Sequence, residues 1–259
     1  DSAHLQEKDA LFVAKRLQRR RRLGEQDDLE VVEPLYSAAD AEQAMRQFRG
    51  VEQGDKIEVA PGLHYQSLDA GHMLGSTAMV LDLEENGTKR RLAFSGDVGR
   101  PNLPIIRDPE QMPPVDYLIM ESTYGDRLHK EIGLVKDKLA DTINRTAGRG
   151  GKVIAPAFAV GRTQQVVLLL HELFLEGRIP SIPIFVDSPL AVNVTEAFRK
   201  HTELFDEETR SFLENGNDPF GFKLLRYVRE VSESKALNDM RGPMLILSAS
   251  GMCEAGRIL

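Results

Sequence analysis

The sequence predicts an α/β protein built from two regions, and three observations support this prediction. Between residues 55 and 98 apolar residues alternate or run together over short segments, a pattern typical of strands. After Gly125, strand-like segments alternate with helix-like segments, which favours a parallel, doubly wound sheet. The chain has 259 residues, enough for one or two domains and a large core. We therefore expect the two regions to meet near Tyr124.

The first segment is expected to be helical, because four apolar residues are spaced for one helix face: Leu11, Phe12, Ala14 and Leu17. A basic run over residues 15–22 is followed by the acidic residues Glu25, Asp27, Asp28 and Glu30. Charge runs of this kind are usually solvated surfaces, and we expect one here. A second helix should begin after Ser37, since Asp40 follows at the spacing of a capping box, and should end near Gly50.

Strands are expected next, over residues 56–60, 63–68, 77–83 and 89–94. The last two should form a hairpin, because Asn86-Gly87 supplies the positive φ angles of a type I′ turn. Residues 117–120 are apolar and predict a short buried strand that ends at Glu121.

The second region should contain helices near residues 131–146, 162–177, 192–201 and 207–215, and strands at 152–156, 182–186 and 244–247. We expect these three strands to be neighbours in one parallel sheet. The loops that follow them are rich in small and hydroxyl residues, and ligands bind at such carboxyl edges. Arg162 opens a helix after the first strand, so its guanidinium and the helix amides could hold an anion. Together the three loops favour a phosphate-bearing ligand.

Composition limits the function further. The net charge is −7, from 33 basic and 40 acidic residues, so nucleic-acid binding would need a local positive groove. A single cysteine, Cys253, argues against a disulfide framework and a cysteine-based zinc cluster, and favours the reducing cytoplasm. No apolar run approaches the roughly 20 residues of a membrane span, and we expect no membrane contact.

Three side chains are candidates for chemistry. His72 follows a strand, Asp97 ends another, and glycines flank both, so an imidazole and a carboxylate could ligate one metal ion. This pair alone is a weak signal, since an isolated histidine and a distant aspartate are more often structural. Glu121 at a strand end is a second candidate, because a carboxylate there needs a partner. Alternatively, Glu121 pairs with an arginine or caps the turn at Ser122-Thr123.

Six ordered motifs resemble one known family. They are Ala-Gly-His-Met-Leu-Gly-Ser at 70–76, Phe-Ser-Gly-Asp at 94–97, Met-Glu-Ser-Thr-Tyr-Gly at 120–125, Pro-Ala-Phe-Ala-Val-Gly-Arg at 156–162, Val-Asp-Ser-Pro at 186–189 and Ser-Ala-Ser-Gly-Met at 248–252. They resemble the β-CASP nucleases of the metallo-β-lactamase fold, in the branch of the RNA 3′-end-processing endonuclease and its bacterial and archaeal relatives. The resemblance extends over essentially the whole chain.

The resemblance implies part of a metallo-β-lactamase αββα core in residues 1–124 and most of a Rossmann-like β-CASP cap in residues 125–259. It implies two zinc ions, with His72 a ligand of one and Asp97 bridging both. Glu121 would support a histidine that protonates the leaving group, so Asp97 and Glu121 are the expected catalytic residues. Phosphates of single-stranded RNA would be held by Arg162, Ser188, Ser248, Ser250 and Gly251.

The chain also departs from the family pattern. The principal zinc motif, His-x-His-x-Asp-His, is absent, because no two histidines stand one residue apart. We therefore expect an internal, C-terminally truncated fragment whose own zinc site is incomplete, cut from a parent that hydrolyses RNA as an endo- or exoribonuclease. The alternative is a catalytically inactive RNA-binding or scaffold paralogue. A small-molecule hydrolase is disfavoured by the region after Gly125, and a homodimer is left open.

Overall fold

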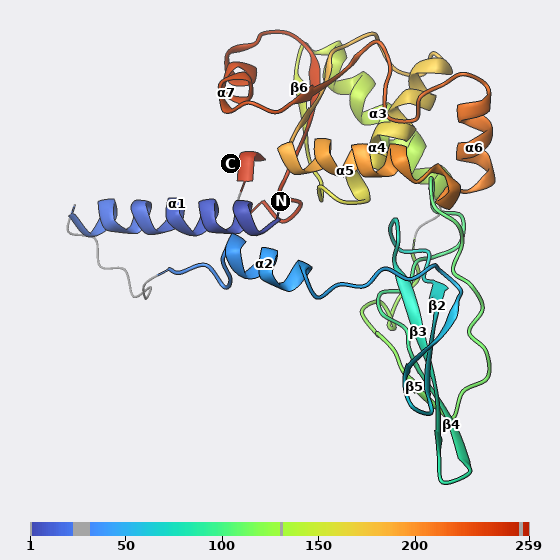
Figure 1. Cartoon of the computed structure of the whole chain (residues 1–259). Coiled ribbons are helices and arrows are strands. Elements are labelled where there is room, and N and C mark those ends of the chain that lie inside the picture. Colours follow the sequence, from blue (N-terminus) through green and yellow to red (C-terminus); the bar gives the residue numbers. More distant parts are fainter. Residues whose placement is uncertain (1, 23–31, 130–131, 254–255, 259) are drawn as a thin grey trace.

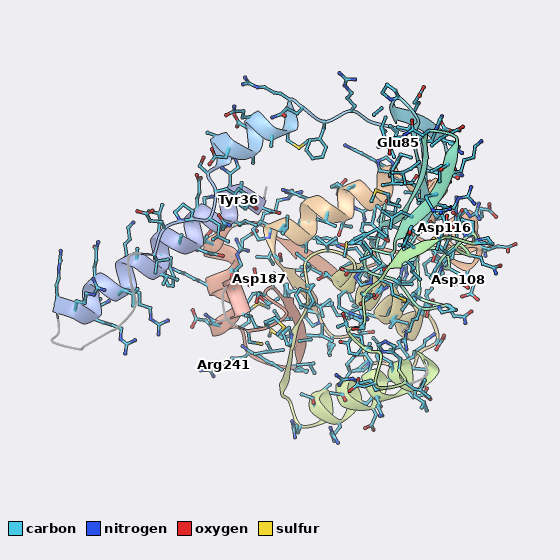
Figure 2. All side chains as sticks on the ribbon, turned by 90° about the horizontal axis from the view of Figure 1, so that it is seen from below. Tyr36, Glu85, Asp108, Asp116, Asp187 and Arg241 are labelled. Atoms are coloured by element: carbon cyan, nitrogen blue, oxygen red, sulfur yellow. The ribbon has the colours of Figure 1, made fainter. Side chains whose placement is uncertain are left out.

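The computed structural model describes residues 2–22, 32–129, 132–253 and 256–258. Two helices come first, α1 (Ser2–Arg22) and α2 (Ala38–Met45), followed by a mainly antiparallel sheet and then by an α/β part. Figures 1 and 2 both show α1 extending away from the rest of the molecule. No helix in the described ranges is long and apolar enough to cross a membrane. The acidic run from Glu25 to Glu30 lies outside the described residues.

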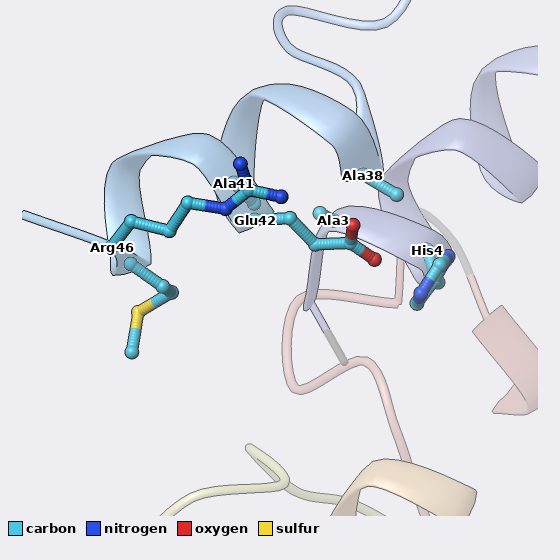
Figure 3. A pocket seen from close by; sticks show the side chains of 7 residues that line it. Ala3, His4, Ala38, Ala41, Glu42 and Arg46 are labelled. Carbon is cyan, nitrogen blue, oxygen red and sulfur yellow. The ribbon is translucent and has the colours of Figure 1, made fainter.

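The capping box expected at Ser37 is present, although α2 ends at Met45, earlier than predicted. The Ser37 hydroxyl accepts from the Asp40 amide at 3.1 Å, and the Asp40 carboxylate accepts from the Ser37 amide at 2.8 Å. The Ala38 amide also donates to the Glu7 carboxylate at 2.9 Å, which ties α2 to α1. Between the two helices lies a hollow of about 400 Å³, shown in Figure 3, lined by Ala3, His4, Ala38, Ala41, Glu42, Met45 and Arg46.

The first sheet has the strand order β1-β2-β3-β4-β5. Its strands are β1 (Lys56–Ala60), β2 (Leu63–Asp69), β3 (Thr77–Glu85), β4 (Thr88–Phe94) and β5 (Tyr117–Ile119). The first four pair antiparallel, and β5 pairs parallel to β4. Asn86 and Gly87 have φ angles of 51° and 78°, as the predicted hairpin turn requires.

The prediction of a buried strand at residues 117–120 is wrong about burial. A strand does form, but all four residues are at least half exposed: Tyr117, Leu118, Ile119 and Met120. The reason is that β5 is the edge strand of the sheet, and no element among the described residues covers its side chains. An apolar run alone cannot distinguish such an edge strand from a core strand.

The second sheet is parallel, with the order β6-β9-β7-β8, and it confirms the predicted α/β class. Its strands are β6 (Lys152–Pro156), β7 (Ile184–Asp187), β8 (Leu225–Val228) and β9 (Met244–Ser248). The helices of this part are α3 (Ile132–Gly148), α4 (Arg162–Leu175), α5 (Pro189–Lys200), α6 (Glu207–Glu214) and α7 (Val231–Asp239), with short 3₁₀ turns η1 (Thr202–Leu204) and η2 (Gly256–Ile258). The three predicted strands are neighbours, with β9 between β6 and β7. The sequence reading missed β8 and α7.

The main core lies between this sheet and its helices, and it contains residues of α3, α4, α5, β7 and β9. A second cluster joins the two regions, because Ile105 and Ile106, from the segment between β4 and β5, pack against Phe198, Phe205 and Phe220. Ile105 is completely buried and has a φ angle of 84°, which a β-branched residue rarely adopts. Its carbonyl accepts from the Asp206 amide at 2.8 Å.

The α/β part of the chain, which we call the cap, contains a buried histidine, His171, that should make the stability of the protein depend on pH. His171 is 5% exposed, stacks on Phe222, and bonds through Nδ1 to the Asp218 carbonyl at 2.9 Å. Burial lowers the pKa of the imidazole below its ordinary 6.5. The unfolded chain therefore binds this proton at higher pH than the folded chain, so stability falls as pH drops below about 6.5.

The expected slope from His171 is at most about 1.4 kcal/mol per pH unit, and it flattens below the folded-state pKa. Denaturant unfolding between pH 7.5 and 5 measures it. The variant His171→Phe should show a shallower pH dependence than wild type, whatever its absolute stability. Identical slopes for the two proteins would show that His171 does not carry this effect.

Candidate functional site

The loop between β2 and β3 carries His72 and is fixed by hydrogen bonds from both of its ends. The Ser76 hydroxyl accepts from the amides of His72 and Met73, each at 3.1 Å. The Asp69 carboxylate accepts from the Gly71 amide at 2.9 Å. These hydrogen bonds fix the backbone of the loop, so the imidazole projects from a defined position just after the end of β2.

The loop after β4 carries Asp97 and crosses the histidine loop in direct backbone contact. The Gly99 amide donates to the Ala70 carbonyl at 2.8 Å. A Cβ on Gly99 would lie 1.7 Å from the carbonyl oxygen of Gly71, so the two backbones touch where only glycine fits. Gly71 itself has a φ angle of 59°. The glycines beside His72 and Asp97 therefore serve to bring the two loops together.

This crossing places the two candidate ligands on one hollow. Nε2 of His72 lies 4.0 Å from Oδ2 of Asp97, and both side chains are partly solvent-exposed. They line a hollow of about 300 Å³ together with residues 73–77 of the histidine loop. Imidazole and carboxylate are both donors that zinc accepts, so the pair fits two positions of a metal site. Among the described residues no third His, Cys, Asp or Glu completes a cluster.

Glu121 lies two residues after the end of β5 and is connected to the Asp97 loop. Its carboxylate accepts from the amide of Val98 at 2.7 Å, and its own amide donates to the Ser95 hydroxyl at 3.2 Å. The Thr123 hydroxyl and then the Val98 amide hold the pKa of this carboxyl below its usual value. Glu121 therefore caps the turn at Thr123, as one of the two sequence readings allowed, and also anchors the loop that bears Asp97.

The loop crossing can be tested by adding one methyl group. Gly99→Ala places a Cβ against the backbone of Gly71 and His72, which cannot move aside as a side chain would. We expect the free energy of unfolding to fall by about 2–3 kcal/mol. The control Gly133→Ala lies in α3 with open space around it, and should be neutral or stabilising by about 0.5–1 kcal/mol. Equal unfolding midpoints for the two variants would refute the close crossing.

The carboxyl edge of the parallel sheet forms the second part of the site. The loop after β6 packs on the loop after β9, because the Ala157 amide donates to the Ser248 carbonyl at 3.0 Å. A Cβ on Gly251 would lie 3.0 Å from the Phe158 ring. The predicted phosphate loops are therefore in contact with each other, and Ser250 and Gly251 are partly exposed.

The five candidate phosphate ligands differ in their availability. Arg162 is exposed, and two acidic residues that a purely structural Arg162 could pair with have other partners: Glu172 pairs with Lys136 and Asp187 with Arg257. Ser188 and Ser248 are both 4% exposed or less. The Ser188 hydroxyl caps α5 by accepting from the Ala191 amide, and the Ser248 hydroxyl donates to the Asp187 carbonyl. Neither hydroxyl is presented at the surface, whereas the Arg162 guanidinium is.

The two halves of the site meet at a glycine. A Cβ on Gly161 would lie 3.7 Å from the Cβ of Met73, and Gly161 has a φ angle of 76°. Met73 follows His72 and Gly161 precedes Arg162, so the candidate metal ligand and the exposed guanidinium stand on touching loops. Sequence reasoning did not identify this contact, nor the supporting roles of Ser76 and Ser95, because small residues in loops carry little signal of their own.

A mainly antiparallel sheet that bears a His–Asp donor pair, followed by a parallel α/β sheet, is the arrangement of a metallo-β-lactamase-fold protein with a β-CASP domain. The family model described as Beta-Casp domain matches residues 163–259. Ribonuclease TTHA0252 of Thermus thermophilus is 35% identical over 236 residues, covering 90% of this chain and 53% of that protein. The RNase J-like protein of Methanocaldococcus jannaschii is 28% identical, with coverage of 86% and 51%.

Endoribonuclease YSH1 of Candida glabrata is also similar, at 30% identity over 228 residues, which are 86% of this chain and 28% of that protein. The chain thus spans about half the length of the first two relatives. It belongs to the β-CASP family of the metallo-β-lactamase fold, as the six sequence motifs indicated.

Proposed function

We propose that the protein hydrolyses phosphodiester bonds of single-stranded RNA in a metal-dependent reaction. The observation that carries this proposal is the close approach of Gly161 to Met73, which brings the loop before the exposed Arg162 to the loop that bears His72. A phosphate held by Arg162 would then lie next to a metal-ligating centre. The relatives named ribonuclease and endoribonuclease support RNA as the substrate.

The residues present fit a zinc site in part. His72 and Asp97 offer one nitrogen and one carboxylate donor from hydrogen-bonded loops, and we propose that these two residues would hold zinc. Bound metal would supply Lewis-acid polarisation of the phosphodiester and a more acidic attacking water. Because structural zinc sites use four ligands, this pair alone should hold zinc weakly, and the further ligands must come from outside the described residues.

The remaining residues position the substrate and the acidic loop. Arg162 grips a phosphate bidentately, since a guanidinium stays protonated. The other proposed phosphate contacts lie at the carboxyl edge of the parallel sheet: Ser250, Gly251 and the backbone near Ser188 and Ser248. Together with Arg162 they form what we call the phosphate edge. Glu121 stays ionised and holds the Asp97 loop through Val98, which suits a carboxylate that orients a neighbouring proton donor. We place the domain boundary near residues 124–125 and the protein in the cytoplasm.

A non-catalytic RNA-binding protein is the second candidate. It is favoured because His72 and Asp97 have no third metal-ligating neighbour among the described residues, and two ligands are too few for a stable zinc site. Such a protein would keep the phosphate edge, and RNA would bind without being cleaved.

Incubation of the whole protein, with the further zinc ligands present, with a 5′-labelled single-stranded RNA distinguishes the two candidates. We expect cleavage that stops on chelation and returns when zinc or manganese is added back. The label pattern separates internal cuts from stepwise removal of terminal nucleotides. RNA that binds but stays intact at every metal concentration would favour the non-catalytic alternative.

The phosphate edge gives its own prediction. Arg162→Ala should weaken binding of single-stranded RNA about equally across sequences and lower the salt slope by roughly one unit. Folding should be unaffected, because the side chain is exposed and its loop is held by backbone contacts. Titrations at several salt concentrations measure both effects. The matched control is Arg145→Ala, an exposed arginine at the end of α3. If both variants bind like wild type, Arg162 does not contact phosphate.

A further inference from the structure

The outward side of α1 carries a row of basic residues with an aromatic ring among them. Lys8, Phe12, Lys15, Arg19 and Arg22 follow one another at steps of four, three, four and three residues. Steps of three and four keep residues on one side of an α-helix. All five are exposed, and Phe12 is 62% exposed. We call this set the α1 outer row.

The opposite side of α1 is the one that packs. Ala3 and Leu17 are each 7% exposed, and Glu7 accepts the hydrogen bond from the Ala38 amide. Gln6 accepts from the Tyr36 amide on the same side. These contacts fix the rotation of α1 about its axis, so the outer row faces away from α2. Figures 1 and 2 show the helix extending clear of both sheets.

The charge on this side is local and of one sign. The whole chain has a net charge of −7, yet the outer row contains four cations and no acid. The two acids of α1 are Glu7, which faces α2, and Asp9, which is outside the row. The neighbouring Arg20 and Arg21 lie off the row and are not needed for it. Concentrated positive charge on an acidic protein creates an attractive field for a polyanion.

Phe12 makes the row more than a charged surface. It is spaced by four residues from Lys8 and by three from Lys15, so cations flank the ring on both sides along the helix. Exposure of a phenyl ring to water is unfavourable in free energy, so an exposed Phe12 suggests a binding partner. Proteins that bind single-stranded nucleic acid without sequence preference combine such cations with aromatic rings on which bases stack. The row runs from residue 8 to residue 22, or roughly 21 Å of helix at 1.5 Å per residue, which is long enough for several nucleotides.

We propose that the α1 outer row is a second binding surface for single-stranded RNA, separate from the phosphate edge of the cap. Phosphates bind Lys8, Lys15, Arg19 and Arg22, and one base stacks on Phe12. The inference rests on the proposed function, because RNA is the polyanion that the protein is proposed to act on. It assigns a ligand to the basic run that the sequence reading left as a solvated surface.

The test uses the protein with the triple change Lys15→Ala, Arg19→Ala and Arg22→Ala, which retains helix-forming residues. A fluorescent oligouridine is titrated in metal-free buffer at several salt concentrations. We expect at least tenfold weaker binding at low salt, and a salt slope reduced by about two units, at about 0.7 per lost phosphate contact. The matched control removes three exposed cations from and beside α3: Lys138→Ala, Arg145→Ala and Arg149→Ala.

A second variant tests the ring without changing charge. Phe12→Leu keeps an apolar residue but removes the stacking surface, and we expect roughly tenfold weaker binding with an unchanged salt slope. Photo-crosslinking with a 4-thiouridine oligonucleotide should label a peptide of residues 8–22 in wild type. Circular dichroism confirms that both variants keep their helix content.

Several outcomes would overturn the inference. In the first, the triple variant binds RNA as tightly as the α3 control. In the second, the wild-type protein does not bind the oligonucleotide. In the third, the outer row is needed for binding to anionic lipid vesicles but not for binding to RNA. The first and third of these leave the proposed function to its own cleavage assay, because none of the altered residues lines the His72–Asp97 hollow, whereas the second also counts against RNA as the substrate. Conversely, row-dependent binding without cleavage would refute hydrolysis and support the row.

Discussion

Replacing Arg257 with alanine is expected to lower the free energy of unfolding by about 3–5 kcal/mol. Asp187 ends β7 and is 4% exposed, so its carboxylate is buried in the cap. Arg257 contacts one carboxylate oxygen at 2.7 Å and Ser234 the other at 2.6 Å. Without the guanidinium, an ionised group would stay buried with a single hydroxyl donor, which is costly.

The matched control is Arg178→Ala, which removes an arginine from an ion pair of the same length. Arg178 contacts Asp137 at 2.7 Å, but both side chains are more than a third exposed. Water replaces such a partner easily, so we expect a loss of no more than about 1 kcal/mol. Urea unfolding of both variants gives the comparison. Similar losses for Arg257 and Arg178 would mean that the Asp187 pair is not buried in solution.

The same arginine bears on the phosphate edge. The Ile258 amide, next to Arg257, donates to the Ala249 carbonyl at 3.1 Å. A Cβ on Gly256 would lie 2.6 Å from that carbonyl oxygen. The loop at residues 248–251 therefore rests on the segment that Arg257 fixes to Asp187. Loss of the pair should loosen this loop as well as destabilise the cap.

Local chemistry explains why so many elements could be predicted from the sequence. Asn86-Gly87 needs no tertiary context to favour a hairpin turn, and the capping box at Ser37 and Asp40 is complete within four residues. The β9 segment is apolar from Met244 to Leu247, and all five residues of the strand are buried. Elements whose formation depends only on residues close together in the sequence were therefore predicted correctly.

Errors arose where the outcome depends on distant parts of the chain. Residues 117–120 are as apolar as β9, but they form an exposed edge, and no local pattern shows which strand will be covered. The short β8 contains the exposed Arg226, which interrupts its apolar pattern. The salt bridge of Asp187 joins residues 70 positions apart, so spacing could not suggest it.

The candidate site shows the same division. The residue types at His72 and Asp97 were identifiable from flanking glycines, but their separation of 4.0 Å depends on two loops crossing at Gly71 and Gly99. The contact of Gly161 with Met73 joins loops 88 positions apart in the chain. Motifs therefore indicated the chemical groups, and only the fold shows which of them meet.

In the whole protein, which is the one to test because this chain spans about half the length of the first two relatives, Asp97→Ala is expected to reduce RNA cleavage at least about 100-fold. Loss of a residue that merely supports a metal ligand costs 10–100-fold in metal affinity or activity, so loss of a ligand should cost more. Asp97 supplies the one carboxylate that lines the hollow with His72. Its side chain is 72% exposed and its neighbouring glycines keep the backbone in place, so folding should be little affected.

The measurements are single-turnover cleavage, RNA affinity without metal, and zinc retained after dialysis. In the whole protein, with its further zinc ligands present, Asp97→Ala should lose cleavage and retained zinc but keep RNA affinity, because phosphate is held at the cap edge. Glu121→Ala should slow cleavage with zinc and affinity nearly unchanged, since Glu121 acts through the Val98 amide and a proton donor. The control Asp141→Ala, exposed on α3, should match wild type. Near-wild-type turnover by Asp97→Ala at controlled zinc would show that the metal is bound elsewhere and that the loop crossing serves the fold alone.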